Sequence, residues 1–497
     1  MAHNNRREFL KKMGLGSLAL ATSKLQGLPF LQDKDERPNI LFIMTDDHAS
    51  RAMSCYGSEM NETPNIDRIA QEGIKLDNCF CTNSICGPSR ATILTGKYSH
   101  KNGFKSNKTE AFDGSQQTLP KILRQNGYET AMIGKWHLRS EPTGFDYYKV
   151  LPGQGKYFSP EFIKKGEWPN TVEEEGYVTD VITDETIEWL ENRNNNNPFF
   201  LMSHHKAPHR PWRPDQKHWD KFKNKHIPAP ADLLDEWETK PEAVRKAQMT
   251  LEKHMHPLDT GGSPPDSLQG DELTQWRYQH FMRRYLACVA SVDDNIGRLL
   301  DYLEQNGLKD NTIVVYTSDQ GFFLGDHGFF DKRIMYEESL RMPFLMRYPD
   351  KIKAGQESDA IVINEDFAPT FLDYAGIKVP SDIQGRSFRT VCQGNTPEDW
   401  REAMYYHYYG YPDWHMVDKH YGIRTKKYKL IHYYGYTDEW AFYDLEADPE
   451  EQWNLYGKPQ YENIINKMKE KLYELMDKYD ETKPTPGQVE EADTTKY

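Results

Sequence analysis

The sequence predicts an α/β fold: a large mixed, mostly parallel sheet sandwiched by helices, then a smaller C-terminal antiparallel sheet packed by one helix. Two runs of β-forming apolar residues, at 39–44 and 312–317, are typical of strands buried on both faces of a helix-covered parallel sheet. An amphipathic helical pattern at 283–306 leads directly into the second run. From about residue 391 the chain becomes dense in tyrosine and strand-like stretches, which indicates the smaller sheet.

Composition limits the classes of function. The 497 residues are 37% hydrophobic and 28% charged, an ordinary globular balance for a chain that can bury a large core. The formal net charge of −14 argues against a nucleic-acid partner, because a broad basic surface is needed to displace counterions from phosphates. The six cysteines show no zinc-like spacing and are too few for a disulfide scaffold, although Cys79 and Cys81 could pair with others after export.

The N-terminus resembles a twin-arginine export signal. Arg6 and Arg7 precede Phe-Leu-Lys and a weakly apolar run at 13–21, which is too short to remain in a bilayer. We therefore expect residues 1–37 to be an export signal and linker, the protein to be periplasmic or secreted, and no stable membrane insertion. The alternative is a basic, frayed terminus.

Carboxylates follow both long apolar runs. The first run ends in Asp46 and Asp47, and the second in Asp319 and Gln320. Open α/β sheets bind ligands at the carboxyl ends of their strands, so parallel neighbours would bring these side chains together. Three converging carboxylates would repel one another unless a hard cation lay among them, and oxygen donors suit calcium. The alternative reading is a set of solvated loop carboxylates.

Two further strand-like runs are followed by cationic residues. The run at 129–133 leads to Lys135 and His137, and the run at 198–202 leads to His209. Farther along, the segment Phe-Asp-Lys-Arg carries Lys332. A single histidine or lysine is more often a surface residue or a satisfied core residue, but the whole series, in this order along the chain, is unlikely to be a coincidence.

The stretch that organises these features begins at Cys86, in Cys-Gly-Pro-Ser-Arg followed by Ala-Thr-Ile-Leu-Thr-Gly. Proline suits the first turn of a helix, and a helix N-terminus favours negative charge. The alternative for Cys86 is an ordinary buried thiol. The stretch resembles the Cys-x-Pro-Ser-Arg signature of the type I sulfatases, a formylglycine-dependent, cysteine-type family of the alkaline phosphatase superfamily. The resemblance extends from about residue 38 to 456.

The resemblance implies an alkaline-phosphatase-like fold and a set of site residues. In the family, a maturation enzyme oxidises the cysteine to formylglycine (3-oxoalanine), whose hydrate attacks sulfur. The matching roles in this sequence are nucleophile for Cys86, steadying of the diol by Arg90, removal of its second proton by His137, protonation of the leaving alcohol by His209, and sulfate binding by Lys135 and Lys332.

One calcium ion per chain is also implied by the resemblance. The matching metal-binding residues are Asp46, Asp47, Cys86, Asp319 and Gln320. Many family members have asparagine at the position of Gln320, and glutamine keeps the oxygen donor.

The remaining segments carry weaker signals. We expect a catalytic domain at 38–390 with an insertion at about 212–279 over the mouth of the site, including a helical piece at 240–253; solvated surface helices are the alternative. A C-terminal α+β subdomain is expected at 391–480, with a helix at 462–478, and a disordered tail at 481–497. His327 and His415 are second-rank candidates for substrate contacts, because most such residues are simply packed.

Together these features predict an exported sulfatase that hydrolyses sulfate esters of a sulfated polysaccharide or its oligosaccharides, of the algal or glycosaminoglycan kind. Two alternatives stay open: a phosphoester or phosphonate monoester hydrolase of the same superfamily, and a non-catalytic carbohydrate-binding relative.

Overall fold

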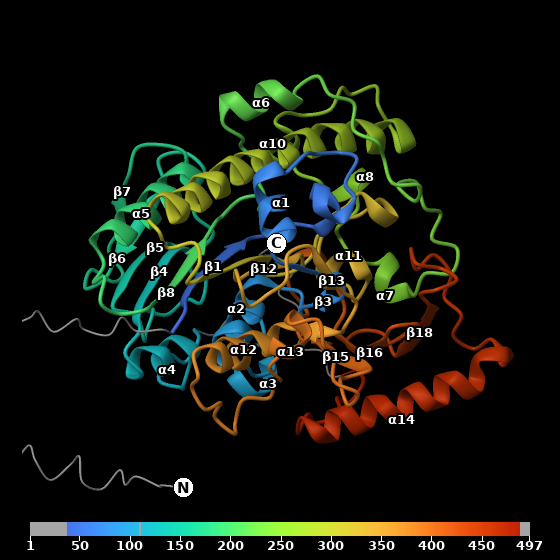
Figure 1. The fold of residues 1–497 in the computed structure, drawn as a ribbon. Coiled ribbons are helices and arrows are strands. Elements are labelled where there is room, and N and C mark those ends of the chain that lie inside the picture. Colours follow the sequence, from blue (N-terminus) through green and yellow to red (C-terminus); the bar gives the residue numbers. More distant parts are fainter. Residues whose placement is uncertain (1–36, 109–110, 488–497) are drawn as a thin grey trace, which may run out of the picture. The chain divides into compact units, whose positions relative to one another are not determined.

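A ten-stranded sheet organises the larger part of the fold in the computed structural model, which describes residues 37–108 and 111–487 (Figure 1). Its five central strands are mutually parallel, and the strands toward both edges include antiparallel pairs. The strand order is β13 (Gln356–Ser358), β2 (Ile74–Leu76), β12 (Phe344–Arg347), β9 (Thr312–Ser318), β1 (Asn39–Thr45), β8 (Phe199–His204), β4 (Glu129–Lys135), β5 (Tyr147–Leu151), β6 (Glu161–Lys164) and β7 (Val172–Glu173).

The register of the central strands brings their carboxyl ends to one edge. Met44 of β1 lies opposite Thr317 of β9 and His204 of β8, so the predicted parallel pairing of the two long apolar runs is confirmed. On the far side of β8, Gly134 of β4 also pairs with His204. A Cβ at Gly134 would lie 2.0 Å from the His204 carbonyl oxygen, so glycine is required for this close approach. The segments after β1, β4, β8 and β9 therefore leave the sheet side by side.

Helices cover both faces, as predicted. Alternate residues of β1 point to opposite sides: Leu41 and Ile43 pack with one group of helices, and Ile40 and Phe42 with the other. The first group contains α1 (Pro64–Gln71), α5 (Val178–Asn192) and α10 (Gly270–Gln305). The second contains α2 (Cys86–Thr95), α4 (Leu119–Gln125) and α12 (Phe367–Tyr374), on the side of the sheet away from α10 in Figure 1.

The long helix begins earlier than predicted. The sequence pattern predicted a helix at 283–306, whereas α10 runs from Gly270 to Gln305. In the part of the helix that precedes residue 283, Phe281 is buried against Trp212, a partner contributed by the loop after β8. The predicted helical piece at 240–253 is instead two short helices, α7 (Glu242–Arg245) and α8 (Leu251–His254).

A second, antiparallel sheet lies toward the C-terminus, as predicted. Its order is β15 (Ala403–Tyr408), β16 (His420–Thr425), β17 (Tyr428–Tyr433) and β18 (Glu439–Asp444). Helix α14 (Glu462–Lys478), which matches the predicted helix, packs its apolar face into the same core, through Ile465, Met468, Leu472 and Met476.

The predicted disordered tail at 481–497 lies outside the described residues from position 488 onward and stays a prediction, but its first residue makes specific contacts. The Glu481 carboxylate is 7% exposed and lies 2.9 Å from Nδ1 of His100, and it also accepts a hydrogen bond from Tyr409. The partners of Glu481 come from distant segments, so a local polar composition could not reveal them. The predicted export signal lies outside the described residues. Among the described helices, none has an apolar stretch long enough to cross a bilayer.

A buried ionic network joins the small sheet to α11 (Glu337–Leu340), the helix that follows Lys332. Lys429 Nζ of β17 lies 3.0 Å from Glu337 and 2.8 Å from Glu451, and Arg424 of β16 lies 3.0 Å from Glu337. Burial by itself raises the pKa of Glu337, but Arg424 and Lys429 hold it well below its usual range. Each carboxylate of the network therefore depends on a cation contributed by the small sheet.

We predict that Lys429→Met lowers the free energy of unfolding by about 3–5 kcal/mol, because it leaves two buried carboxylates without their shared cation. Chemical denaturation monitored by fluorescence measures the change. The matched control is Lys427→Met, which removes the exposed pair with Glu446 and should change stability little. Similar midpoints for the two variants would contradict the prediction.

Candidate active site

Cys86 is the first residue of α2 and is buried, with 1% exposure. Its thiol donates a hydrogen bond to Asp46 Oδ1 at 3.3 Å. Burial raises the pKa of the Cys86 thiol to about 12, with the nearby Asp319 and Asp47 acting in the same direction. An unmodified Cys86 is therefore protonated at neutral pH and is a poor nucleophile, since the thiolate is the reactive form.

Three carboxylates meet at the carboxyl ends of β1 and β9. Asp46, Asp47 and Asp319 are fully buried, and each contributes an oxygen to a group in which all the oxygens lie within 4.8 Å of one another. The backbone N–H of Asp47 donates to Asp319 Oδ1 at 3.3 Å. Burial raises the pKa of Asp47 to about 6; Lys332 opposes this shift and Asp319 adds to it. The predicted convergence of the two strand ends is thus present.

Gln320 completes this donor set. Its Nε2 donates to Asp47 Oδ1, and its Oε1 is buried and accepts no hydrogen bond from the described residues. A free amide oxygen beside three carboxylates is the kind of oxygen-rich set that calcium prefers. The residues present therefore fit a hard cation.

Cationic side chains surround the carboxylates. Lys135, the last residue of β4, pairs with Asp46, and Lys332 Nζ lies 2.6 Å from Asp47 Oδ1. Arg90 Nη2 lies 2.8 Å from Asp319 Oδ2, while its Nη1 donates to the Lys135 carbonyl at 2.7 Å. Each acidic residue thus has a cationic partner. These pairs offset much of the cost of burying the charges.

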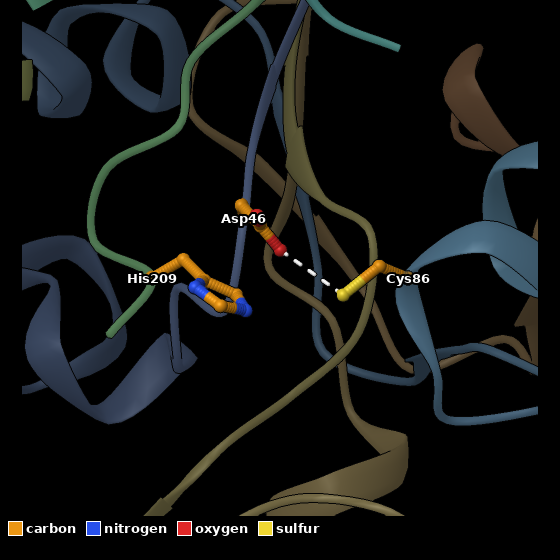
Figure 2. Close-up of side chains that lie close together, drawn as sticks. All are labelled: Asp46, Cys86 and His209. Atoms are coloured by element: carbon orange, nitrogen blue, oxygen red, sulfur yellow. Dashed lines mark hydrogen bonds between the residues drawn. The ribbon is translucent and has the colours of Figure 1, made fainter. Parts of the chain in front are cut away.

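His209 faces Asp46 and Cys86 from the loop after β8, as Figure 2 shows. Its Nδ1–H donates to the Arg210 carbonyl, which leaves Nε2 directed to the site, 3.8 Å from Asp47 Oδ2. Burial and the ammonium groups of Lys135 and Lys332 hold the pKa of His209 well below its usual range. His137 has a lowered pKa for the same reasons, and its Nδ1 has no hydrogen-bond partner among the described residues.

A cavity of about 600 Å³ opens onto these groups, lined in part by Cys86, His209 and Lys332. Residues of the predicted insertion line it as well, from Gln248 to Asp259, and so does the loop at 413–416 that precedes β16. The insertion and this loop are joined by reciprocal bonds: His415 Nδ1 donates to the Gln248 carbonyl, and the Gln248 N–H donates to the His415 carbonyl, both at 2.6 Å.

The two second-rank histidines have different environments. His415 lines the cavity, and its Nε2 lies 3.2 Å from Asp331 Oδ2. His327 does not line the cavity: it is fully buried, with Nδ1 3.0 Å from Lys240 Nζ and 3.2 Å from Asp232 Oδ2. The structure therefore does not bring His327 to the cavity, because the insertion encloses the ring, and a substrate contact at this residue stays a prediction.

Sequence reasoning missed several charged groups that line the cavity, among them Arg210, Asp331, Arg333 and Lys206. Asp331 and Arg333 flank Lys332, and their positive φ angles of 80° and 93° turn this short segment sharply. The signal was available, since both residues belong to the motif that predicted Lys332. Lys206 also lines the cavity and is 2% exposed. Lys206 lies between the end of β8 and His209, three positions before that histidine. Its closeness in sequence to His209 was the one signal that could have identified it.

Comparisons with known proteins agree with this geometry. The sequence profile of the sulfatase family matches residues 38–377, and that of the C-terminal part of N-sulphoglucosamine sulphohydrolase matches residues 325–478. The chain is 50% identical to an N-acetylglucosamine-6-O-sulfatase of Bacteroides thetaiotaomicron, covering 91% of this chain and 88% of the relative. It is 30% identical to an ulvan-active sulfatase of Formosa agariphila, covering 90% and 83%.

The fold resembles a solved structure described as BT4656 in complex with its substrate D-glucosamine-2-N,6-O-disulfate. The TM-score is 0.86 at 50% identity, and the match covers 89% of this chain and 98% of the other. Profile, relatives and fold agree over most of the described chain. The chain therefore belongs to the sulfatase family of sulfuric ester hydrolases.

Proposed function

We propose that this sulfatase removes the 6-O-sulfate from N-acetylglucosamine or glucosamine residues of glycosaminoglycan fragments. The observation that carries the proposal is the 50% identity, over 91% of the chain, to a protein named for that activity. The solved structure bound to a 6-O-sulfated glucosamine supports the same substrate class. Of the two substrate classes expected from the sequence, algal polysaccharides are less favoured than glycosaminoglycans, because the ulvan-active relative is only 30% identical.

The cavity offers groups that suit a sugar. Asp331 is held by Arg333 and by His415 Nε2, and Arg210 Nη1 lies 3.3 Å from the same histidine nitrogen. A carboxylate held by a guanidinium can accept hydrogen bonds from sugar hydroxyls while the guanidinium groups donate to ring substituents. These residues line the same cavity as Cys86, so a sugar bound to them would present its sulfate to the catalytic groups.

Hydrolysis of a sulfate ester requires stabilisation of charge on the sulfuryl oxygens and a proton for the leaving alcohol. Lys135, Lys332 and Arg90 would meet the first need. His209 Nε2 would supply the proton to the leaving oxygen. An anionic sulfate bound nearby would favour the charged imidazole and so raise the pKa of His209 in the complex. His137 would accept a proton from the hydrated aldehyde proposed at position 86.

Cys86 is the proposed site of conversion to formylglycine by a maturation enzyme. The hydrated aldehyde would supply a nucleophilic oxygen, which the buried thiol does not. The raised thiol pKa supports this reading, because thiolate chemistry is disfavoured at this position.

A calcium ion would be held by Asp46, Asp47, Asp319 and Gln320, with position 86 as a further ligand; when bound it would offset their charge and attract the sulfate. Export to the periplasm or beyond rests on the twin-arginine motif at Arg6 and Arg7. The division into a catalytic domain and a C-terminal subdomain at about residue 391 remains a proposal.

The substrate proposal predicts that matured enzyme releases sulfate from N-acetylglucosamine-6-sulfate with a kcat/KM at least about 100-fold above that for galactose-6-sulfate or N-acetylglucosamine-3-sulfate. The reason is that a site built to hydrogen-bond particular hydroxyls rejects analogues that misplace them. Ion chromatography of released sulfate measures this. Faster turnover of a phosphonate monoester would favour the other superfamily chemistry, and equal rates on all three sugars would contradict the assignment.

The nucleophile proposal predicts that Cys86→Ala lowers kcat/KM by at least about 1,000-fold while the protein stays folded. Peptide mass spectrometry of active wild-type enzyme should show the aldehyde at position 86. The control is Cys392→Ala, another buried cysteine, whose Sγ contacts Met346 instead of the site; its kcat/KM should stay near wild type. An unaltered thiol in fully active protein would rule out the proposed conversion.

The metal proposal predicts that chelation with EGTA lowers both activity and the thermal midpoint, and that added calcium restores them. Calcium at 100 times its Kd should raise the free energy of unfolding by about 2.7 kcal/mol by mass action. Differential scanning fluorimetry with and without calcium reports the shift. Asp47→Asn should show a much smaller response, since it removes one negative charge from the metal-binding group; identical midpoints for wild type in both conditions would exclude the site.

A further inference from the structure

A third buried lysine lies beside the catalytic groups. Lys206 follows β8, and the backbone pairing of β8 with β1 continues around it: the His205 N–H donates to the Met44 carbonyl at 2.8 Å, and the Asp46 N–H donates to the Ala207 carbonyl at 3.4 Å. The backbone of Lys206 is therefore fixed next to Asp46. Its side chain is 2% exposed and lines the cavity shared by Cys86 and His209.

The ammonium group of Lys206 donates no hydrogen bond to any described residue. In contrast, Lys135 and Lys332 are already paired with Asp46 and Asp47. An ammonium has three donors, and leaving them unsatisfied away from water costs several kcal/mol. Within the described part of the chain, Lys206 is therefore a buried cation with no hydrogen-bonded anion, and it lines a cavity.

An aromatic side chain holds this ammonium in place. Lys206 Nζ lies over the ring of Tyr157, 4.9 Å from its centroid. The Tyr157 hydroxyl donates to the His209 carbonyl at 2.8 Å. One tyrosine thus positions both the unpaired ammonium and the backbone of the proposed general acid. A cation–π contact orients an ammonium without using its N–H donors for a carboxylate or carbonyl.

The charges around Lys206 are consistent with a ligand-binding role. Burial lowers the pKa of Lys206 to about 8, Asp47 and Cys86 oppose that shift, and Lys332 adds to it. The group is therefore mainly protonated at neutral pH. A bound anion would stabilise this protonated form further.

We propose that Lys206 is a third sulfate-binding residue, whose Nζ donates to a non-bridging sulfuryl oxygen of the substrate beside Lys135 and Lys332. This inference rests on the proposed sulfate-ester hydrolysis at position 86. Three ammonium groups around one sulfate would share the charge that develops on its oxygens in the transition state. A group acting there touches substrate, and so its removal should affect every sulfate ester, whatever the leaving alcohol.

The test is Lys206→Met in full-length, matured enzyme. We expect kcat/KM to fall by about 100-fold or more for both 4-nitrophenyl sulfate and N-acetylglucosamine-6-sulfate, the loss typical of removing one oxyanion donor. Competitive inhibition by inorganic sulfate should weaken by about tenfold, as for the loss of one ionic hydrogen bond. The thermal midpoint should stay level or rise, because an unpaired buried charge has been removed.

The matched control is Lys240→Met. Lys240 is equally buried, at 2% exposure, but its Nζ donates to the Glu451 carbonyl at 2.7 Å and it does not line the cavity. This variant should lower the thermal midpoint and leave sulfate inhibition and kcat/KM of the folded enzyme near wild type. Lys206→Met should therefore weaken catalysis and sulfate inhibition without lowering the thermal midpoint, whereas Lys240→Met should lower the thermal midpoint alone.

Wild-type kcat/KM and sulfate inhibition in Lys206→Met would overturn the inference. So would a lower thermal midpoint with unchanged sulfate inhibition, since that pattern belongs to a structural lysine. Lys206→Gln is read by the same criteria if the methionine variant does not fold. If wild type hydrolyses no sulfate ester but binds inorganic sulfate more tightly than Lys206→Met, the proposed function fails and the binding assignment stands.

Discussion

The mutual repulsion of three carboxylates removed from water is the constraint on which the rest of the site depends. Asp46, Asp47 and Asp319 have no exposed surface, and their oxygens lie within 4.8 Å of one another. Such a group persists only when cations surround it. Lys135, Lys332 and Arg90 do so from three separate segments. The parallel alignment of β1 with β9 creates the repulsion, and the neighbouring strand ends and α2 supply the charges that offset it.

The same arrangement determines what Cys86 can do. The residue begins a buried helix, where partial positive charge at the N-terminus would favour an anion, yet burial among carboxylates keeps its thiol protonated. The helix N-terminus thus favours an anion at position 86, whereas burial among carboxylates disfavours a thiolate there. Both observations are explained if the catalytic group at position 86 is not a thiol. The lowered pKa of His209 and the Lys206 ammonium, which donates no hydrogen bond to a described residue, agree with the proposal that an anionic substrate binds here.

The C-terminal sheet contributes to the site through loops instead of through its core. Buried pairs of Glu337 with Arg424 and Lys429 attach the sheet to α11, just after the turn that carries Asp331, Lys332 and Arg333. The loop at 413–416 extends from this sheet to the cavity and bonds to the insertion through Gln248. Stability of the small sheet and the shape of this wall of the cavity are therefore linked.

The sequence by itself determined the class of fold, the carboxylates at two strand ends and the helix that starts at Cys86, because these follow from local hydrophobic patterns and from residues adjacent to them. The helix at 462–478 was equally local. Tertiary structure alone decided which polar side chains are paired. His327 is enclosed by Asp232 and Lys240, Glu481 pairs with His100, and the Lys206 ammonium donates no hydrogen bond to any residue that the structure describes. Each of these outcomes depends on contacts between segments far apart in the chain, which no local pattern records.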